Sequence, residues 1–213
     1  MPRIKPRPTR ATRAKQGGTP KPSIEDRLLA AMERLLEQGQ RFAVVSVEQL
    51  CQEAGISRAT FYLHFRDKGQ LVARLMAHVT EEIIDSTGTW MSNAENAERK
   101  DVQQALVGMV QTFKKHQATL SAVIDTAPHD ESVAALYQQM VDRICEQSRD
   151  SLDVIQRKGL SRPGATHDVA NDLGAMLVMY CIRVVGDLDE EGLARLAGSL
   201  GYISASTAFS DSN

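Results

Sequence analysis

Apolar residues recur three and four positions apart along almost the whole chain after residue 23, and this spacing constrains the fold more than any other feature. Such spacing places the apolar side chains on one face of an α-helix. Strands would instead require alternating, β-branched runs bounded by turn residues, and no such run occurs. The sequence therefore predicts an all-α protein.

Cap and turn residues divide the pattern into nine predicted helices. Serine and aspartate side chains at helix starts accept hydrogen bonds from free backbone amides, and glycine often follows a helix end. These signals, with Pro128 and the RKGLSRPGAT segment as breaks, give the boundaries. The predicted helices run from Ser23 to Gly39 and over 47–54, 58–65, 68–87, 101–115, 117–127, 131–158, 167–186 and 190–206.

The first 22 residues differ from the rest in charge. They carry seven of the 25 basic residues and no acidic one, so the other 18 face all 27 acidic residues, a net of −9. Four prolines and Gly17-Gly18 predict that this arm is disordered. A basic arm on an acidic body suggests a polyanionic partner, although a solvated tail without a partner has the same composition. We thus expect an arm over 1–22, a head over 23–68 and a body over 69–213.

Several classes of protein are excluded by what the sequence lacks. Cys51, Cys145 and Cys181 form no C-x-x-C pair, which argues against disulfides and zinc. The longest apolar run, Leu173–Gly186, has 14 residues and contains Arg183, which is too short and too charged for a bilayer span, and no signal-peptide core begins the chain. The histidines are scattered, and no phosphate-binding or nucleophile motif occurs. We expect a cytoplasmic protein that is no enzyme and needs no metal or cofactor.

Two short capped helices joined by a turn with Gly55 form a helix-turn-helix. At 100° per residue, Phe61 and Phe65 share a face and should pack inward. The opposite face then presents small and polar groups that suit the major groove. An arginine there, Arg58, can bind guanine through two hydrogen bonds, while Thr60 can touch a thymine methyl group.

The run VSVEQLCQEAGISRATFYLHFRDKGQL (45–71) resembles the DNA-binding signature of TetR-family regulators, most specifically in AGIS-R-x-T-x-Y-x-x-F and the lysine two residues after an arginine. The stretch 113–140 also looks like the ethionamide-resistance repressors of that family. Glu48 departs from members with a basic residue there, and either accepts from a cytosine amine or faces solvent. The resemblance and the helix geometry together predict DNA contacts at Ser46, Glu48, Ser57, Arg58, Ala59, Thr60, Tyr62, His64 and Lys68.

The body is predicted to hold a pocket and a dimer interface. Methionine and aromatic side chains on facing helices can line an adaptable apolar pocket, although the same residues also build ordinary cores. The predicted pocket residues are Trp90, Met109, Phe113, Tyr137, Met140, Met176, Met179 and Tyr180. The last two helices are apolar nearly all round and need cover on both sides, either from one large core or from a second copy. The resemblance implies a four-helix bundle between subunits, and the predicted interface is Val178, Ile182, Val185, Leu193, Leu196, Ala197, Leu200 and Gly201.

The resemblance also implies a function. We expect a homodimer that binds a pseudo-palindromic double-stranded operator, since one helix-turn-helix reads only a half-site. A small lipophilic effector in the body would lower operator affinity, which makes the protein a repressor. The alternative is a helix-turn-helix module that binds another protein rather than a specific DNA sequence.

Overall fold

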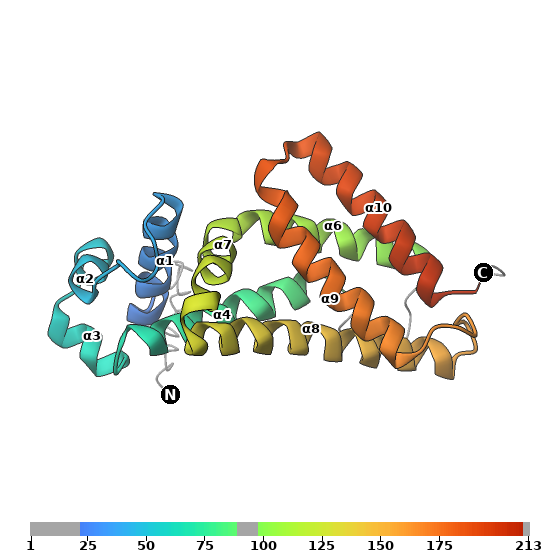
Figure 1. Ribbon diagram of the computed structural model, residues 1–213, viewed down its shortest axis with the longest axis horizontal. Helices are drawn as coiled ribbons and strands as arrows, with labels where there is room; N and C mark the ends of the chain where they lie inside the picture. The colour runs from blue at the N-terminus through green and yellow to red at the C-terminus, as the bar shows by residue number, and fades with distance from the viewer. Residues whose placement is uncertain (1–21, 89–97, 211–213) are drawn as a thin grey trace, which may run out of the picture.

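The computed structural model describes residues 22–88 and 98–210, and these are entirely helical apart from turns and one isolated bridge between Ser161 and Phe209 (Figure 1). The predicted all-α fold with nine α-helices is confirmed within these ranges. The α-helices are α1 (Ile24–Glu37), α2 (Val47–Ala54), α3 (Arg58–His64), α4 (Lys68–Ser86), α6 (Arg99–Lys115), α7 (Gln117–Thr126), α8 (Glu131–Arg157), α9 (His167–Val184) and α10 (Glu190–Ala208).

Helix boundaries follow the caps that the sequence suggested. Ser23 and Ser46 both form complete capping boxes, in which each serine hydroxyl accepts from the third helical amide and that residue's side chain returns a bond. The differences are small: α6 begins at Arg99, and two 3-10 turns, η2 (Ala127–His129) and η3 (Val185–Asp187), extend α7 and α9. Residues 1–21 of the basic arm and Trp90 lie outside the described residues.

The helices α1, α2 and α3 form a head at one end of the molecule (Figure 1). Its centre consists of fully buried apolar side chains, among them Leu28, Met32, Leu50 and Phe61. Arg27 of α1 fastens the turn of the helix-turn-helix, because its Nη2 donates to the backbone oxygens of Ala54 at 2.6 Å and of Gly55 at 2.8 Å. The head is therefore held together both by apolar packing and by this polar brace.

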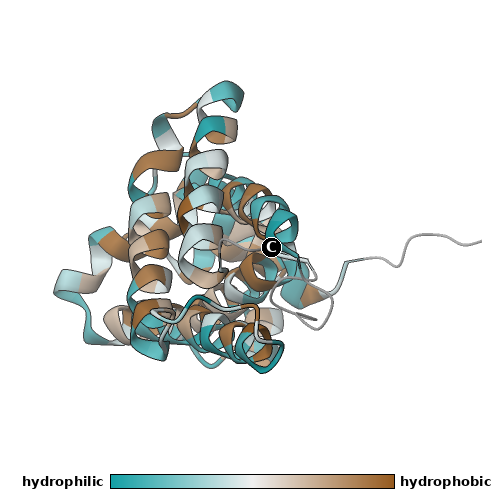
Figure 2. Cartoon of the chain, turned by 90° about the vertical axis from the view of Figure 1, so that its right-hand side faces the viewer, coloured by the Kyte–Doolittle hydropathy of each residue, from teal (hydrophilic) through white to brown (hydrophobic). Residues whose placement is uncertain are grey.

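The body consists of α4 and α6–α10, with the long α8 beside both α4 and α9, and α10 packed on α6. In the hydropathy colouring of Figure 2, teal and brown alternate around the helices, as expected for amphipathic helices that bury one side. The segment His167–Asp187 is long and apolar enough to cross a bilayer by length and composition, and 28% of its most apolar 18-residue window is buried. This segment is longer than the 14-residue apolar run identified in the sequence. Its buried side packs on α8, so part of its apolar surface belongs to the core of the body.

Helix α4 runs from the head into the body, so it is the element that links them (Figure 1). Its end packs very closely on α6: a Cβ atom placed on Gly108 would lie 2.0 Å from the backbone oxygen of Ser86. No real side chain tolerates such a contact, so the absence of one at Gly108 is what permits this crossing.

Candidate DNA-binding surface and body pocket

The short helix α3 is fixed at its start by Ser57. The Ser57 hydroxyl accepts from the backbone N–H of Thr60 at 3.0 Å and lies 2.9 Å from the Thr60 hydroxyl. Just before it, Gly55 ends α2 with a φ of 63°, a left-handed conformation that favours glycine. The αL residue and the capping serine together set the angle between the two helices.

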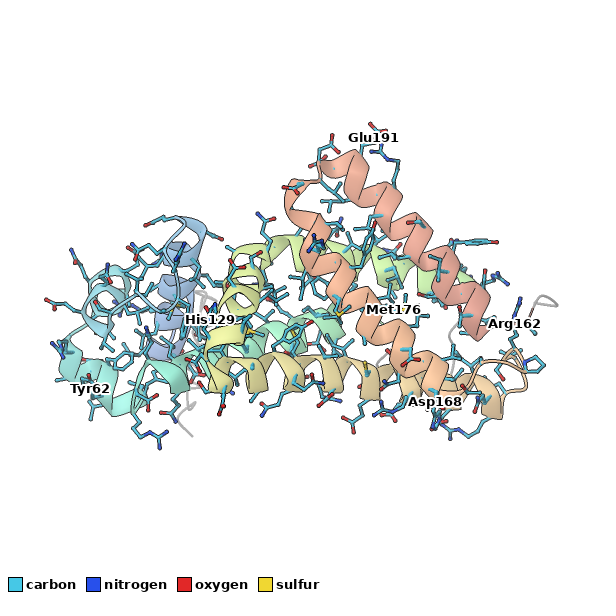
Figure 3. The ribbon with its side chains drawn as sticks, in the orientation of Figure 1. Tyr62, His129, Arg162, Asp168, Met176 and Glu191 are labelled. Carbon is cyan, nitrogen blue, oxygen red and sulfur yellow. The ribbon has the colours of Figure 1, made fainter. Side chains whose placement is uncertain are left out.

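The two faces of α3 divide as predicted. Phe61 is fully buried and Phe65 is 5% exposed, and their ring centroids lie 5.8 Å apart. On the other side Leu63 is 84% exposed and Tyr62 is 51% exposed, with its ring edge-on to Phe61 at 5.3 Å. The phenyl rings hold the helix against the head, and Tyr62 projects from the end of the molecule (Figure 3).

The polar side chains of this outer face have hydrogen-bonding capacity to spare. In the part of the chain that the structure describes, the exposed side chains of Arg58, Tyr62 and His64 make no hydrogen bond or ion pair. Ala59 is exposed beside them and Thr60 is partly covered. Helix α3 also has no acidic residue in its first turn, so its N-terminal dipole remains favourable to phosphate. A small, cationic and donor-rich face of this kind suits the major groove.

The other predicted contacts of the head have structural duties as well. Ser46 and Ser57 are exposed, but their hydroxyl oxygens cap α2 and α3. Glu48 is exposed in the first turn of α2, where a carboxylate stabilises the helix dipole. The dipole explains the presence of Glu48 without a base contact, so a cytosine contact and a solvated side chain both remain possible roles.

Lys68, another predicted phosphate contact, already has partners within the head. Its ammonium group donates to the backbone oxygens of Phe42 at 2.9 Å, Ala43 at 3.2 Å and Val45 at 2.9 Å, and lies 4.7 Å from the Phe42 ring centroid. Burial lowers the pKa of this lysine. All three ammonium hydrogens are used within the head, so the side chain braces the loop before α2, and the predicted phosphate contact would require one of these bonds to break.

A buried histidine connects the head to the body. His116, between α6 and α7, is 3% exposed, and its Nδ1 lies 2.7 Å from Glu33 Oε1 of α1, while its Nε2 lies 2.5 Å from Glu82 Oε2 of α4. Burial opposes the charged ring, but the hydrogen bonds to both carboxylates outweigh it and raise the pKa of His116. Lys115 also contacts Glu82, at 2.5 Å. We call Glu33, His116 and Glu82 the carboxylate–histidine clasp.

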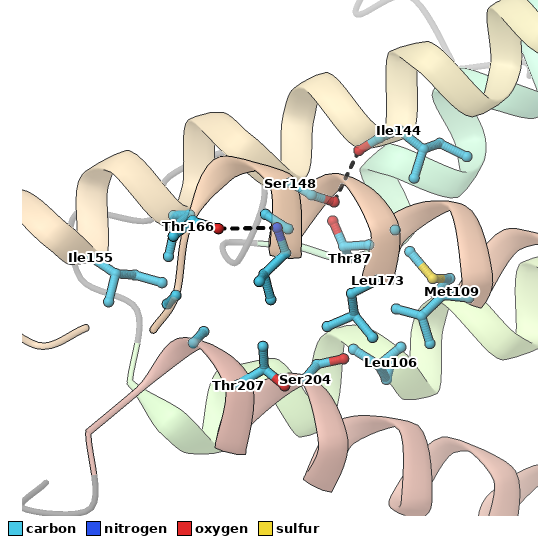
Figure 4. Close-up of a pocket in the computed structure, with 17 residues that line it drawn as sticks. Thr87, Leu106, Met109, Ile144, Ser148, Ile155, Thr166, Leu173, Ser204 and Thr207 are labelled. Carbon is cyan, nitrogen blue, oxygen red and sulfur yellow. Dashed lines mark hydrogen bonds between the residues drawn. The ribbon is translucent and has the colours of Figure 1, made fainter. Parts of the chain in front are cut away.

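The body contains an apolar pocket with about 680 Å³ of empty space, part of it open to solvent (Figure 4). It lies among the end of α4, α6, α8, α9 and α10, well away from α3. Charged side chains are absent from its described lining, which is aliphatic apart from a methionine and five hydroxyl groups. The lining residues are Thr87, Leu106, Met109, Ile144, Ser148, Leu152, Ile155, Ala165, Thr166, Val169, Ala170, Leu173, Gly174, Leu177, Ser204, Thr207 and Ala208.

Most of the predicted pocket residues are located elsewhere. Met109 does line the pocket. Phe113 and Met140 are buried in the core, and Tyr137 is half-buried outside the lining, while the remaining described residues of that set are exposed on α9: Met176 (62%), Met179 (58%) and Tyr180 (51%). The prediction favoured large flexible side chains, whereas the lining has small residues at helical spacing, such as Ser204, Thr207 and Ala208. That pattern of small inward residues was the available signal.

The predicted dimer residues also need correction. Val178, Ile182, Val185, Leu196, Ala197, Leu200 and Gly201 are buried within the chain, and Leu193 is half-buried. These side chains face the body of their own chain. The sequence did not indicate this, because a helix that is apolar on nearly every side has no polar stripe to mark its outer face. The outer face of α9 and α10 instead exposes Met176, Met179, Tyr180, Tyr202 and Ile203, which we call the α9–α10 face. Met176 is labelled in Figure 3.

The head thus defines a helix-turn-helix DNA-binding protein, and comparisons with known proteins give the family. Residues 28–75 match the family "Bacterial regulatory proteins, tetR family". The HTH-type transcriptional regulator EthR of Mycobacterium tuberculosis is 28% identical over 163 residues, which are 74% of this chain and 75% of that protein. Its Mycolicibacterium smegmatis counterpart is 34% identical over 124 residues, 52% of this chain and 55% of that one.

Solved structures agree in fold. A TetR-family regulator of Mesorhizobium loti superimposes with a TM-score of 0.71 at 16% identity, covering 88% of this chain and 97% of that one. GusR of Salmonella enterica has a TM-score of 0.68 at 17% identity, with 85% and 93% covered. The match of the head, the EthR relatives and the shared fold together support a TetR-family transcriptional regulator, and these relatives are regulators rather than enzymes.

Proposed function

We propose that this protein is a cytoplasmic repressor that binds a pseudo-palindromic operator as a homodimer and is released by a lipophilic small molecule. The observation that carries the DNA part is the outer face of α3, where Arg58, Tyr62 and His64 have unused hydrogen-bonding groups beside the small residue Ala59. One head reads only a few base pairs, so specific binding requires two heads related by a two-fold axis.

The α9–α10 face supports the homodimer. Five large apolar side chains are exposed on α9 and α10, and a concentration of exposed apolar side chains marks interaction sites. On α10, Ala194 and Gly198 are exposed and stand eight and four residues before Tyr202, so they share its side of the helix and leave room for a close helix approach. A second copy of the same two helices would form the four-helix bundle expected for the family.

The pocket supports the lipophilic effector. Its described lining has no charged side chain to balance an ion, and an apolar cavity favours apolar ligands. Thr87, just beyond α4, lines the pocket, while Lys68 begins the same helix in the head. A ligand that favours one position of α4 therefore changes the spacing of the two heads, and a differential affinity of about 1–3 kcal/mol weakens operator binding about 5- to 150-fold.

An operator shift assay with purified protein tests the DNA part, using the DNA beside its own gene with competitor DNA in excess. Arg58→Ala should weaken specific binding about 5- to 150-fold for each half-site, the effect of about 1–3 kcal/mol for a two-bond guanine contact, and adding Tyr62→Ala should weaken it further. Arg157→Ala, which removes the same charge at the far end of α8, should leave binding unchanged. A protein-interaction module would instead lose its complex to competitor DNA, and the exposed Leu63 and Val44 would then contact a protein.

The same assay tests release. Uncharged lipophilic compounds should lower operator affinity, and Ala170→Phe, which fills part of the pocket, should abolish that response while DNA binding persists. Ala135→Phe on the exposed side of α8 is the matched control. Release that is equal in the two variants would place the effector outside this pocket.

Sedimentation analysis tests the dimer. Met179→Glu places a charge in the α9–α10 face and should give monomers, whereas Leu63→Glu, an equally drastic change on the exposed side of α3, should leave the dimer intact. A Met179→Glu protein that stays dimeric would move the interface elsewhere.

A further inference from the structure

One hydroxyl in the pocket has no partner. Ser204 of α10 is 7% exposed, and its Oγ makes no hydrogen bond in the structure although it is buried. A buried hydroxyl that lacks a partner costs about 1–3 kcal/mol in desolvation. A helical serine usually avoids this cost by donating to the carbonyl four residues earlier, but Ser204 does not. Its hydroxyl lines the cavity, and Figure 4 draws no bond to it.

The other hydroxyls of the lining differ from Ser204 in this respect. Thr87 donates to the Ile84 oxygen at 2.5 Å, Ser148 to the Ile144 oxygen at 3.0 Å and Thr207 to the Ile203 oxygen at 2.8 Å. Thr166 accepts from the Val169 amide at 3.3 Å as the cap of α9. Among the described lining residues, Ser204 is thus the hydroxyl that makes no bond within the protein, and it has a hydrogen to donate.

The surroundings restrict what the hydroxyl can bind. The described lining has no cation to pair with a carboxylate or phosphate, and burying an unpaired charge is costly. The start of α9 borders the pocket and would favour an anion, but Asp168 in its first turn already supplies negative charge there. The position of Asp168 on that end of the helix is labelled in Figure 3. An uncharged oxygen can accept from Ser204 without either cost.

We propose that Ser204 donates a hydrogen bond to an uncharged oxygen acceptor, such as an ester or ketone carbonyl, on an otherwise apolar effector. This inference rests on the proposed function, because it specifies the chemistry of the effector that the pocket takes. Aliphatic side chains of α8 and α9 would surround the hydrocarbon part. Ser204 would then select oxygen-bearing ligands over pure hydrocarbons and over their ionised acids.

Three probes separate these contributions in calorimetric titrations of the full chain: methyl octanoate, octanoate and butylbenzene, which has no acceptor oxygen. Ser204→Ala should weaken methyl octanoate binding about 2- to 12-fold, the equivalent of one net hydrogen bond of about 0.5–1.5 kcal/mol, and should leave butylbenzene binding unchanged. Ser204→Thr keeps the hydroxyl and should retain the wild-type affinity for the ester. Octanoate should bind the wild type more weakly than its methyl ester.

Thr207→Val is the matched control, because it removes a lining hydroxyl that is already bonded within α10. It should leave the affinities for methyl octanoate and butylbenzene unchanged. Equal losses for both probes in Ser204→Ala, or no loss for either, would overturn the role of Ser204, as would tighter binding of octanoate than of its ester.

Operator binding distinguishes this inference from the function on which it rests. If methyl octanoate binds in a Ser204-dependent way but leaves operator affinity unchanged, the ligand chemistry stands and the proposed release fails. If none of the three probes binds, the pocket is no effector site and both proposals fall.

Discussion

The head and the body are built from the same kind of amphipathic helix, but they leave different surfaces uncovered. In the head, short helices bury most of their large apolar residues, and α3 presents mainly small and polar groups outside, with Leu63 as the large apolar exception. In the body, long helices leave an apolar pocket inside and the apolar α9–α10 face outside. Local capping chemistry determines the head, whereas the body depends on what fills or covers it. Substitutions of single capping or anchoring residues should therefore disturb the head, whereas the properties of the body should depend on what occupies its pocket and covers the α9–α10 face.

The largest expected effect comes from the anchor of α3. Phe61→Ala should lower the free energy of unfolding by about 3–5 kcal/mol, because Phe61 is fully buried in the small core of the head. Phe113→Ala, an equally buried phenylalanine of the body, should cost a similar amount. Hydrogen exchange distinguishes the two: the first change should expose amides of α1–α3, and the second those of α6 and its neighbours. Identical exchange patterns would mean that head and body unfold as one unit.

The carboxylate–histidine clasp should have the next largest effect, because it joins the two regions. His116→Gln retains one hydrogen bond at most and should cost about 1.5–3 kcal/mol, the usual contribution of a hydrogen bond to a charged group. The measurement is urea unfolding of both proteins at pH 6.

The clasp also predicts a pH dependence. The pKa of His116 is raised in the folded protein, so its stabilisation is complete below the ordinary histidine pKa of about 6.5 and is lost as the pH rises through the folded value. For Glu82, burial alone would raise the pKa, but bonds from Lys115 and His116 lower it, so its contribution is lost only as the pH falls through that lowered value. Wild-type stability should fall above about pH 6.5, and His116→Gln should remove that part of the curve. A mutant with an unchanged profile would exclude the clasp as its cause.

A smaller effect is expected where α4 meets α6. Gly108→Ala forces a methyl group against the backbone of Ser86 and should destabilise the protein by about 1–3 kcal/mol, and it should also weaken operator binding because α4 is displaced. Gly198→Ala on α10 has open space and should stabilise the helix by about 0.5–1 kcal/mol. Thermal unfolding measures both. Since Gly198 lies on the α9–α10 face, the dimer should be checked in the same samples. A stable Gly108→Ala protein would show that the crossing adapts easily.

The smallest effect concerns Lys68. Lys68→Met removes the three bonds to the loop before α2, which should cost about 1 kcal/mol after solvent replaces them at the loop carbonyls. The salt dependence of operator binding should stay the same, because no phosphate contact is lost. A slope that falls by about 0.9 for each head, or about 1.8 for the dimer, would return Lys68 to the DNA contacts.

The head could be predicted from the sequence because its signals are local. Ser57, Gly55 and the spacing of Phe61 and Phe65 each determine a conformation within a few residues, and the structure places them as expected. Lys68 shows the limit: its partners lie 23 to 26 residues away, and nothing in its neighbourhood indicates that its ammonium group is occupied.

The body could be predicted only as a set of helices. For α9, apolar residues lie on nearly every side, so the sequence cannot tell Val178, which faces the core, from Met179, which faces solvent. That choice is made by packing, chiefly on α8 and also on α6 and α7, which the residue spacing within α9 does not reveal. The pocket is likewise defined by where side chains are small, as at Ala170 and Gly174, and small residues at helical spacing are a weaker signal than a stripe of large apolar residues.

The close crossing at Gly108 has a mechanical consequence. Helix α4 has 19 residues, so about 28 Å separate the contact of its last residue, Ser86, with Gly108 from its first turn, which follows α3 in the head. A tilt of about 5° at this contact would swing the reading helix by about 2.5 Å, nearly the rise of one base pair (about 3.4 Å). A displacement at the pocket too small to disturb the packing of α6 would thus be magnified into a misfit between two half-sites, with α4 as a stiff lever.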